Sequence, residues 1–143
     1  MARSKQRWTN QAGATLLEIL VVLAIIALLA AVVGPRVVGY LSKAKSTTAE
    51  LQLDNLKTAV ELFYVDLGRY PSEQEGLQAL MTRPTAAGDW AGPYLDAEDA
   101  LQDPWGRDYV YRSPGQNERP FDVLSFGRDG VEGGDGEDAD LVN

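Results

Sequence analysis

The 143-residue sequence contains no cysteine and no histidine. Without cysteine, the chain can form neither a disulfide nor a thiolate metal site. Without histidine, it lacks the commonest general base and the commonest protein ligand of transition metals. Because an enzyme would have to rely on carboxylates, lysine, serine or tyrosine, we expect a structural or binding protein rather than a catalyst.

Positive charge is also scarce, with 13 lysines and arginines against 21 acidic residues and a net charge of −8. Residues 1–13 hold three bases and no acid, so the remainder of the chain has a net charge of −11. Nucleic-acid binding requires a basic face, which argues against that class of function. Outside the apolar segment, the chain is long enough for one small domain.

Charge is nearly absent from residues 14–33, where Glu18 is the only ionisable residue. The uninterrupted apolar run that follows, Ile19 to Val33, is shorter than the ~20 residues that cross a bilayer. The segment therefore spans a membrane only if Glu18 is included, although a carboxylate in hydrocarbon is costly and suggests a function. Glu18 either neutralises an amine on a neighbouring copy or snorkels to water near the positive helix N-terminus.

The first 13 residues, which contain Arg3, Lys5 and Arg7, precede this apolar run as a secretory leader does. Cleavage after the apolar run, near Gly34, would release a conventional secreted domain. Cleavage after Gly13 would instead leave the apolar helix at the N-terminus of the mature protein, with a new amine on residue 14.

The residues around Gly13 resemble the processing signal of type IV pilins and type II secretion pseudopilins. In this family, a prepilin peptidase cuts after the glycine and methylates the new amine, so the resemblance implies cleavage between Gly13 and Ala14 and an N-methyl group on Ala14. It also favours the assembly role of Glu18. The family usually has phenylalanine or methionine where this chain has Ala14. The matching residues are Gly13-Ala14-Thr15-Leu16-Leu17-Glu18-Ile19.

A second helical segment follows the apolar run and ends at Leu67-Gly68, a C-cap pattern with Pro71 close behind it. One helix from Ala14 to Leu67 would be about 80 Å long. Pro35 is predicted to kink it or melt it locally, and the resemblance to pilins implies a flexible joint for assembly there. The apolar positions expected to form one stripe are Val37, Leu41, Ala44, Thr48, Leu51, Ala59, Val60, Phe63 and Leu67, with a shift of face near Leu53 and Leu56.

The remainder, residues 72–143, is predicted to be a small α+β part. A capping box at Ser72 and Glu75 precedes a short helix over 76–81, and a loop-rich stretch leads to strands at 108–112 and 121–126. The predicted fold is α+β and pilin-like: a long N-terminal helix, membrane-spanning in its inner half (14–33), whose outer half (34–71) packs on a small antiparallel sheet. The residues expected to cover the helix are Tyr109, Tyr111, Phe121, Val123 and Leu124.

Further motifs in this part are similar to those of the major pseudopilin of type II secretion systems. The resemblance implies a structural subunit that polymerises into the periplasmic pseudopilus and drives protein export. It also implies a single pass through the bacterial inner membrane, with the globular part in the periplasm. The motifs are Arg69-Tyr70-Pro71, Glu75-Gly76-Leu77-Gln78-Ala79-Leu80, Gln102-Asp103-Pro104-Trp105-Gly106 and Ser125-Phe126-Gly127-Arg128-Asp129-Gly130.

The partners implied by the resemblance are further copies of the chain in a helical homopolymer, minor pseudopilins, an inner-membrane platform protein, an assembly ATPase and the prepilin peptidase. Membrane lipid would surround the helix before assembly. A type IV pilin or minor pseudopilin is one alternative, although the missing cysteines and the Asp103-Pro104-Trp105-Gly106 motif argue against it. A stand-alone secreted calcium-binding domain is the other.

The C-terminal loop from Asp129 to Asp140 holds six acids and no base within twelve residues, interleaved with glycines. Such a segment is either a solvated acidic tail or a loop whose oxygens converge on Ca²⁺, although its spacing is not that of an EF-hand. The resemblance implies a structural calcium in the loop 125–140, held by Asp129, Asp138, Asp140 and the backbone oxygen of Phe126.

Overall fold

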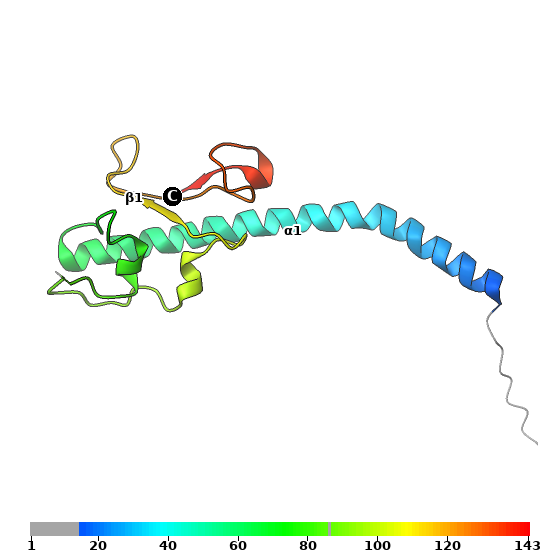
Figure 1. The fold of residues 1–143 in the computed structure, drawn as a ribbon, viewed down its shortest axis with the longest axis horizontal. Coiled ribbons are helices and arrows are strands. Elements are labelled where there is room, and N and C mark those ends of the chain that lie inside the picture. The colour runs from blue at the N-terminus through cyan, green and yellow to red at the C-terminus, as the bar shows by residue number, and fades with distance from the viewer. Residues whose placement is uncertain (1–14, 86) are drawn as a thin grey trace, which may run out of the picture. The chain divides into compact units, whose positions relative to one another are not determined.

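The computed structural model describes residues 15–85 and 87–143, and it divides the chain into two compact units, Met1–Gly39 and Tyr40–Asn143. The helix α1 (Leu16–Leu67) is followed by three short 3-10 helices and three strands (Figure 1). The predicted cleavage site at Gly13 and Ala14 lies outside the described residues. The 3-10 helices are η1 (Leu77–Leu80), η2 (Glu98–Leu101) and η3 (Gly136–Asp138).

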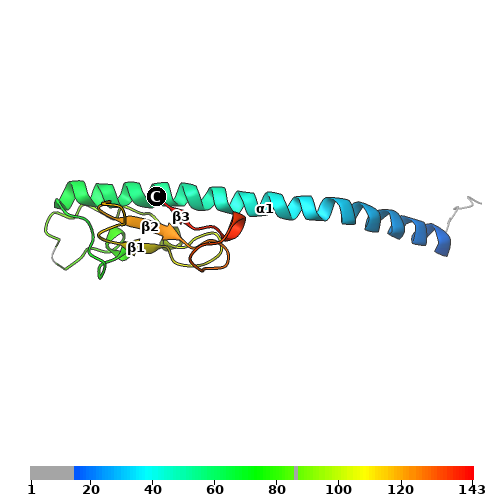
Figure 2. The same cartoon turned by 90° about the horizontal axis from the view of Figure 1, so that it is seen from above.

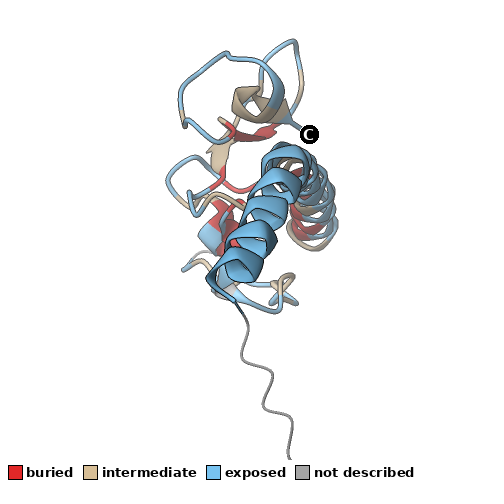
Figure 3. Cartoon of the chain, turned by 90° about the vertical axis from the view of Figure 1, so that its right-hand side faces the viewer, coloured by how far each residue is buried: buried red, intermediate tan, exposed pale blue. Residues whose placement is uncertain are grey.

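In the first unit, every described residue is exposed, as the pale blue ribbon of this part of α1 shows (Figure 3). Thr15 caps the helix, because its Oγ1 accepts a hydrogen bond from the backbone N–H of Glu18 at 3.2 Å. The helix continues through Pro35 without interruption, so of the two predicted outcomes, a kink or local melting, melting does not occur. Proline removes one hydrogen bond of the helix, and the helix continues on both sides of it.

The second unit buries one face of α1, made by residues three or four positions apart. The prediction of Ala59, Val60 and Phe63 on this face is confirmed. The prediction of Val37, Leu41 and Leu51 as part of a packed stripe is wrong, because all three are exposed, Leu51 to 61%. The buried positions of α1 are Ala49, Leu53, Leu56, Ala59, Val60 and Phe63.

Helix geometry explains the error at Leu51. The face that packs is centred on Leu53 and Leu56, and two residues of an α-helix turn through about 200°. Leu51 therefore lies opposite Leu53 and points away from the domain.

The strands β1 (Val110–Arg112), β2 (Asp122–Ser125) and β3 (Leu141–Val142) form an antiparallel sheet in the order β1-β2-β3. Figure 2 shows the sheet beside the part of α1 that belongs to the second unit. The two predicted strands are confirmed, although each is shorter than predicted, and β3 was not predicted. β2 is buried along its whole length. Core residues outside β2 include Leu77, Leu80, Leu101, Tyr109 and Phe121.

The capping box is present, but it does not open an α-helix. Ser72 N–H donates to Glu75 Oε2 at 2.8 Å, and Glu75 N–H donates to Ser72 Oγ at 3.2 Å. These bonds close a turn that ends at Gly76, whose φ is 55°. Because a residue in the left-handed region cannot continue an α-helix, only the 3-10 helix η1 follows. The short helix predicted over 76–81 is thus present, as a 3-10 helix over Leu77–Leu80.

The end of α1 follows the sequence pattern. Gly68 has a φ of 65°, and its N–H donates to the carbonyl of Tyr64 at 2.8 Å. Just beyond it, Arg69 makes a bidentate ion pair with Glu75, at 2.7 and 2.8 Å. This pair fastens the end of α1 to the turn that leads to η1.

Candidate functional site

Glu18 lies in the first turn of α1, on a surface that is otherwise apolar. The residue is exposed, and the neighbouring side chains Leu16 and Leu17 are 81% and 70% exposed. Among residues 15–85 and 87–143, no ion pair involves Glu18. The carboxylate is therefore available to a cation from outside the chain.

The helix that carries Glu18 is, within the described residues, the one helix long and apolar enough to cross a membrane. Its N-terminal part buries nothing in this chain, so its apolar side chains need lipid or other helices around them. Pro35, the second predicted assembly residue, lies inside α1 and is exposed.

The acidic loop folds back on itself through two close backbone contacts. A Cβ on Gly127 would lie 2.7 Å from the carbonyl oxygen of Glu137, and a Cβ on Gly134 would lie 2.5 Å from that of Asp138. Both glycines also have positive φ, 63° and 87°. Glycine is needed at these positions because any side chain would separate the two arms of the loop.

All four predicted calcium ligands accept hydrogen bonds from other residues of this loop. The carbonyl of Phe126 accepts the N–H of Gly130 at 3.2 Å, and Asp129 Oδ1 accepts the N–H of Val131 at 3.1 Å. Asp138 accepts two hydrogen bonds from Arg128, each at 2.8 Å.

Asp140 differs from the other three. Its Oδ2 accepts the N–H of Gly133 at 2.9 Å, whereas its Oδ1 is buried and has no hydrogen-bond partner. In the described part of the chain, no three acidic side chains are grouped closely enough to hold a metal ion. Calcium binding by this loop therefore stays a prediction.

Arg128 lies in the predicted loop 125–140, but no role was predicted for it from the sequence. It is the only base after Arg119 in the sequence and directly precedes the acidic run. Its guanidinium also contacts Glu137 Oε2 at 3.3 Å. The sequence contains the signal for this role, because a single base next to six acids is the expected counter-ion.

Glu137 joins the loop to the Trp105 turn. Its Oε1 accepts the indole N–H of Trp105 at 2.9 Å. This hydrogen bond lowers the pKa of the Glu137 carboxyl, and the nearby positive charges of Arg128 and Lys45 lower it further. Glu137 therefore stays ionised and holds the loop to the Trp105 turn.

The motif around Asp103 serves the same connection. Asp103 is buried, and its Oδ1 accepts the N–H groups of Trp105 and Arg107 at 3.0 and 2.9 Å. Its Oδ2 accepts the hydroxyl of Ser125 at 2.6 Å. The Asp103 carboxylate thus joins the motif 102–106 to the motif 125–130. It holds the Trp105 turn against the end of β2, where the acidic loop begins.

Comparisons with known proteins agree with this arrangement. Residues 36–143 match the family model described as type II secretion system (T2SS), protein G, and residues 8–34 match the prokaryotic N-terminal methylation motif. The type II secretion system core protein G of Pseudomonas aeruginosa is 41% identical over 94% of this chain and 95% of its own. That of Xanthomonas campestris is 38% identical over 99% of this chain and 94% of its own.

A solved structure agrees as well. The crystal structure of the major pseudopilin from the type 2 secretion system of enterohaemorrhagic Escherichia coli matches with a TM-score of 0.60 at 31% identity. The match covers 74% of this chain and 91% of that one. The predicted α+β pilin-like fold and the predicted family are thereby confirmed: the chain belongs to the type II secretion system protein G family.

Proposed function

We propose that this chain is the structural subunit that polymerises into the periplasmic pseudopilus and drives protein export by type II secretion. The observation that supports the proposal is the N-terminal part of α1. Up to residue 33 it is exposed and apolar on every face, and Glu18 is its only charged residue. The chain that carries this segment belongs to the protein G family. No catalysis is involved, because the function of such a subunit is assembly.

The chemistry of assembly follows from Glu18. Cleavage between Gly13 and Ala14, which the methylation motif over residues 8–34 supports, would place a cationic amine one helical turn from this carboxylate. Methylation of an amine keeps its charge. When Glu18 of one copy meets the amine of the next, both charges are satisfied. A head-to-tail contact of this kind generates an open helical filament.

The same reasoning supports a location and a set of partners. A single apolar helix preceded by a basic segment fits one pass through the inner membrane, with the acidic domain in the periplasm. The prepilin peptidase would act at Gly13. Minor pseudopilins, an inner-membrane platform protein and an assembly ATPase are the proposed components that add subunits to the filament.

We also infer that the loop 125–140 binds calcium. The buried Oδ1 of Asp140, which has no partner, supports this proposal. Asp129, Asp138 and the carbonyl of Phe126 would supply further oxygens, and Asp138 would have to exchange Arg128 for the ion. Bound calcium would neutralise the carboxylates and tie the two ends of the loop together.

The assembly proposal is tested with Glu18→Gln and its matched control Glu50→Gln, an exposed acid on the domain part of α1. The variants are overproduced in a host with a type II secretion system, and filaments sheared from the cells are measured. We expect Glu18→Gln to reduce filaments at least about tenfold, because breaking a buried ion pair costs about 3–5 kcal/mol. Equal filament yields would refute the pairing, and mass spectrometry of the assembled subunit checks the cleavage after Gly13.

A further inference from the structure

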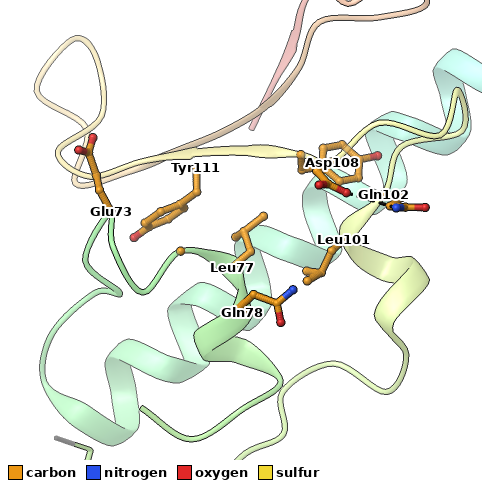
Figure 4. A pocket seen from close by; sticks show the side chains of 9 residues that line it. Glu73, Leu77, Gln78, Leu101, Gln102, Asp108 and Tyr111 are labelled. Carbon is orange, nitrogen blue, oxygen red and sulfur yellow. Dashed lines mark hydrogen bonds between the residues drawn. The ribbon is translucent and has the colours of Figure 1, made fainter. Parts of the chain in front are cut away.

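We propose that the open edge of β1 and the groove beside it bind an extended segment of another protein through a lysine or arginine side chain. The groove has a volume of about 430 Å³ and lies between β1 and η1 (Figure 4). It is separate from Glu18 and from the acidic loop, so this interaction adds to the proposed assembly function. Its lining residues are Glu73, Gly76, Leu77, Gln78, Leu101, Gln102, Asp108, Tyr109 and Tyr111.

The main-chain groups of Tyr111 face the open edge. Val123 is the β2 residue opposite Tyr111, and its N–H and carbonyl are both bonded to Asn143, at 2.7 and 3.1 Å. In an antiparallel pair, hydrogen-bonded and non-hydrogen-bonded positions alternate. The pair of Tyr111 and Val123 is therefore a non-hydrogen-bonded one, and the N–H and carbonyl of Tyr111 point away from β2.

At Tyr109, another segment of the chain already pairs with this edge of β1. The N–H of Tyr109, two residues before Tyr111 and so on the same side of β1, donates to the carbonyl of Leu101 at 3.0 Å. This pairing ends before Tyr111. In the described part of the chain, no other segment continues it, so a strand added here would have one free donor and one free acceptor to bond.

The groove next to this edge has an apolar base and an acidic rim. Leu77 and Leu101 are buried core residues, and their side chains lie between β1 and η1 (Figure 4). Glu73 and Asp108 are exposed and lie near opposite ends of β1 in the same view. No ion pair of the described residues engages either carboxylate, and the lining contains no lysine or arginine.

This combination fits a long cationic side chain. The aliphatic stem of a lysine or arginine would cover Leu77 and the ring of Tyr111, while its charge would reach Glu73 or Asp108. The occupant is a different protein rather than a second copy, because this chain carries a net charge of −8 and a second copy would be repelled on average. A basic extended segment, by contrast, complements both the edge and the rim.

The experiment uses the isotopically labelled full chain in detergent micelles and amide NMR spectra. The probe is a capped pentapeptide, threonine-valine-arginine-valine-threonine. Two matched controls are the same peptide with glutamate in place of arginine, and the arginine peptide with its three central amides N-methylated. We expect the arginine peptide to shift the amide signals of Tyr111, Leu77 and Gln78, with a Kd of about 0.1–1 mM, because only a few contacts form. Both controls should bind at least about fivefold more weakly.

Variants of the protein test the contribution of the acidic rim independently of the strand edge of β1. The double variant Glu73→Gln/Asp108→Asn should weaken the arginine peptide about fivefold and leave the melting temperature unchanged, since both side chains are exposed. Glu50→Gln should change neither. Equal binding of either control peptide, or no shift at millimolar peptide, overturns the proposal. If the same signals move with protein concentration in the absence of peptide, a second copy occupies the groove and the proposal is also wrong.

Discussion

Arg128 donates two hydrogen bonds to the carboxylate of Asp138, from Nε and Nη2, each at 2.8 Å. A bidentate pair of this kind is the strongest form of a charge-assisted hydrogen bond. The acidic loop therefore contains its own cation, bound to one of the oxygens that calcium would need. The carboxylates of the loop are partly neutralised before any ion arrives.

We predict that Arg128→Gln increases the dependence of the domain on calcium. Without calcium, the variant should melt at a lower temperature than the wild type, because Asp138 and Glu137 lose their counter-ion. With calcium, the gain in melting temperature should be larger than in the wild type, and half-saturation should need less calcium. Thermal unfolding of the full chain in detergent, with calcium or a chelator, measures both effects. Equal gains would show that Arg128 does not compete with the ion.

Asp140→Asn should abolish the stabilisation by calcium. The substitution keeps the shape of the side chain but removes the negative charge of the carboxylate, whose Oδ1 is buried and has no partner. Calcium at one hundred times its Kd adds about 2.7 kcal/mol to the free energy of unfolding of a protein that binds it only when folded, and this gain should be lost. Glu132→Gln, an exposed acid in the same loop, is the matched control. A variant that keeps the full gain would remove Asp140 from the ligand set.

The ion pair of Arg69 and Glu75 should make stability depend on acid pH. The hydrogen bond from Arg69 is the main cause that lowers the pKa of Glu75 from 4.5 to about 2. Because the pKa is lower in the folded state, this stabilisation is complete above pH 4.5 and is lost as the pH falls towards 2. Solvent screens the pair, since Arg69 is 41% exposed, so we expect only about 1 kcal/mol.

Glu75→Gln should accordingly lower the free energy of unfolding by about 1 kcal/mol at neutral pH. It should also flatten the pH dependence between about 4.5 and about 2, measured by denaturant unfolding. Glu73→Gln, two residues away and exposed, should keep the wild-type profile. A profile for Glu75→Gln as steep as that of the wild type would mean that another acid controls the transition.

Two substitutions on α1 test which face packs. Phe63 is completely buried, so Phe63→Ala should cost about 3–5 kcal/mol of unfolding free energy. Leu51 is 61% exposed, and Leu51→Ala should change stability by no more than about 0.5 kcal/mol. Denaturant unfolding of the full chain in detergent compares them. A large loss at Leu51 would restore the stripe predicted from the sequence.

The sequence predicted the features that depend on local chemistry. Gly68 ends α1 because glycine readily adopts a positive φ. The side chains of Ser72 and Glu75 each accept a hydrogen bond from the other residue's backbone N–H, as their spacing requires. The apolar run before Pro35 was long enough to predict a helix. In each case, residues close in sequence determine the outcome.

The features that were missed depend on contacts between distant residues. Leu51 and Leu53 are equally apolar, and only the position of the domain decides which one is buried. β3 has two residues, too few to show a strand period, and it exists because β2 offers an edge. The pairing of Arg128 with Asp138 likewise depends on how the loop closes to bring together two residues that are ten positions apart.

The hydrogen bond from the Trp105 indole to Glu137 has a practical consequence. After removal of residues 1–13, the chain keeps two tryptophans, and the other, Trp90, donates its indole N–H to the carbonyl of Ala79, away from the acidic loop. Any rearrangement of the loop changes the surroundings of one fluorophore and leaves the second as an internal reference. The emission spectrum of the protein is thus a label-free optical readout of the loop.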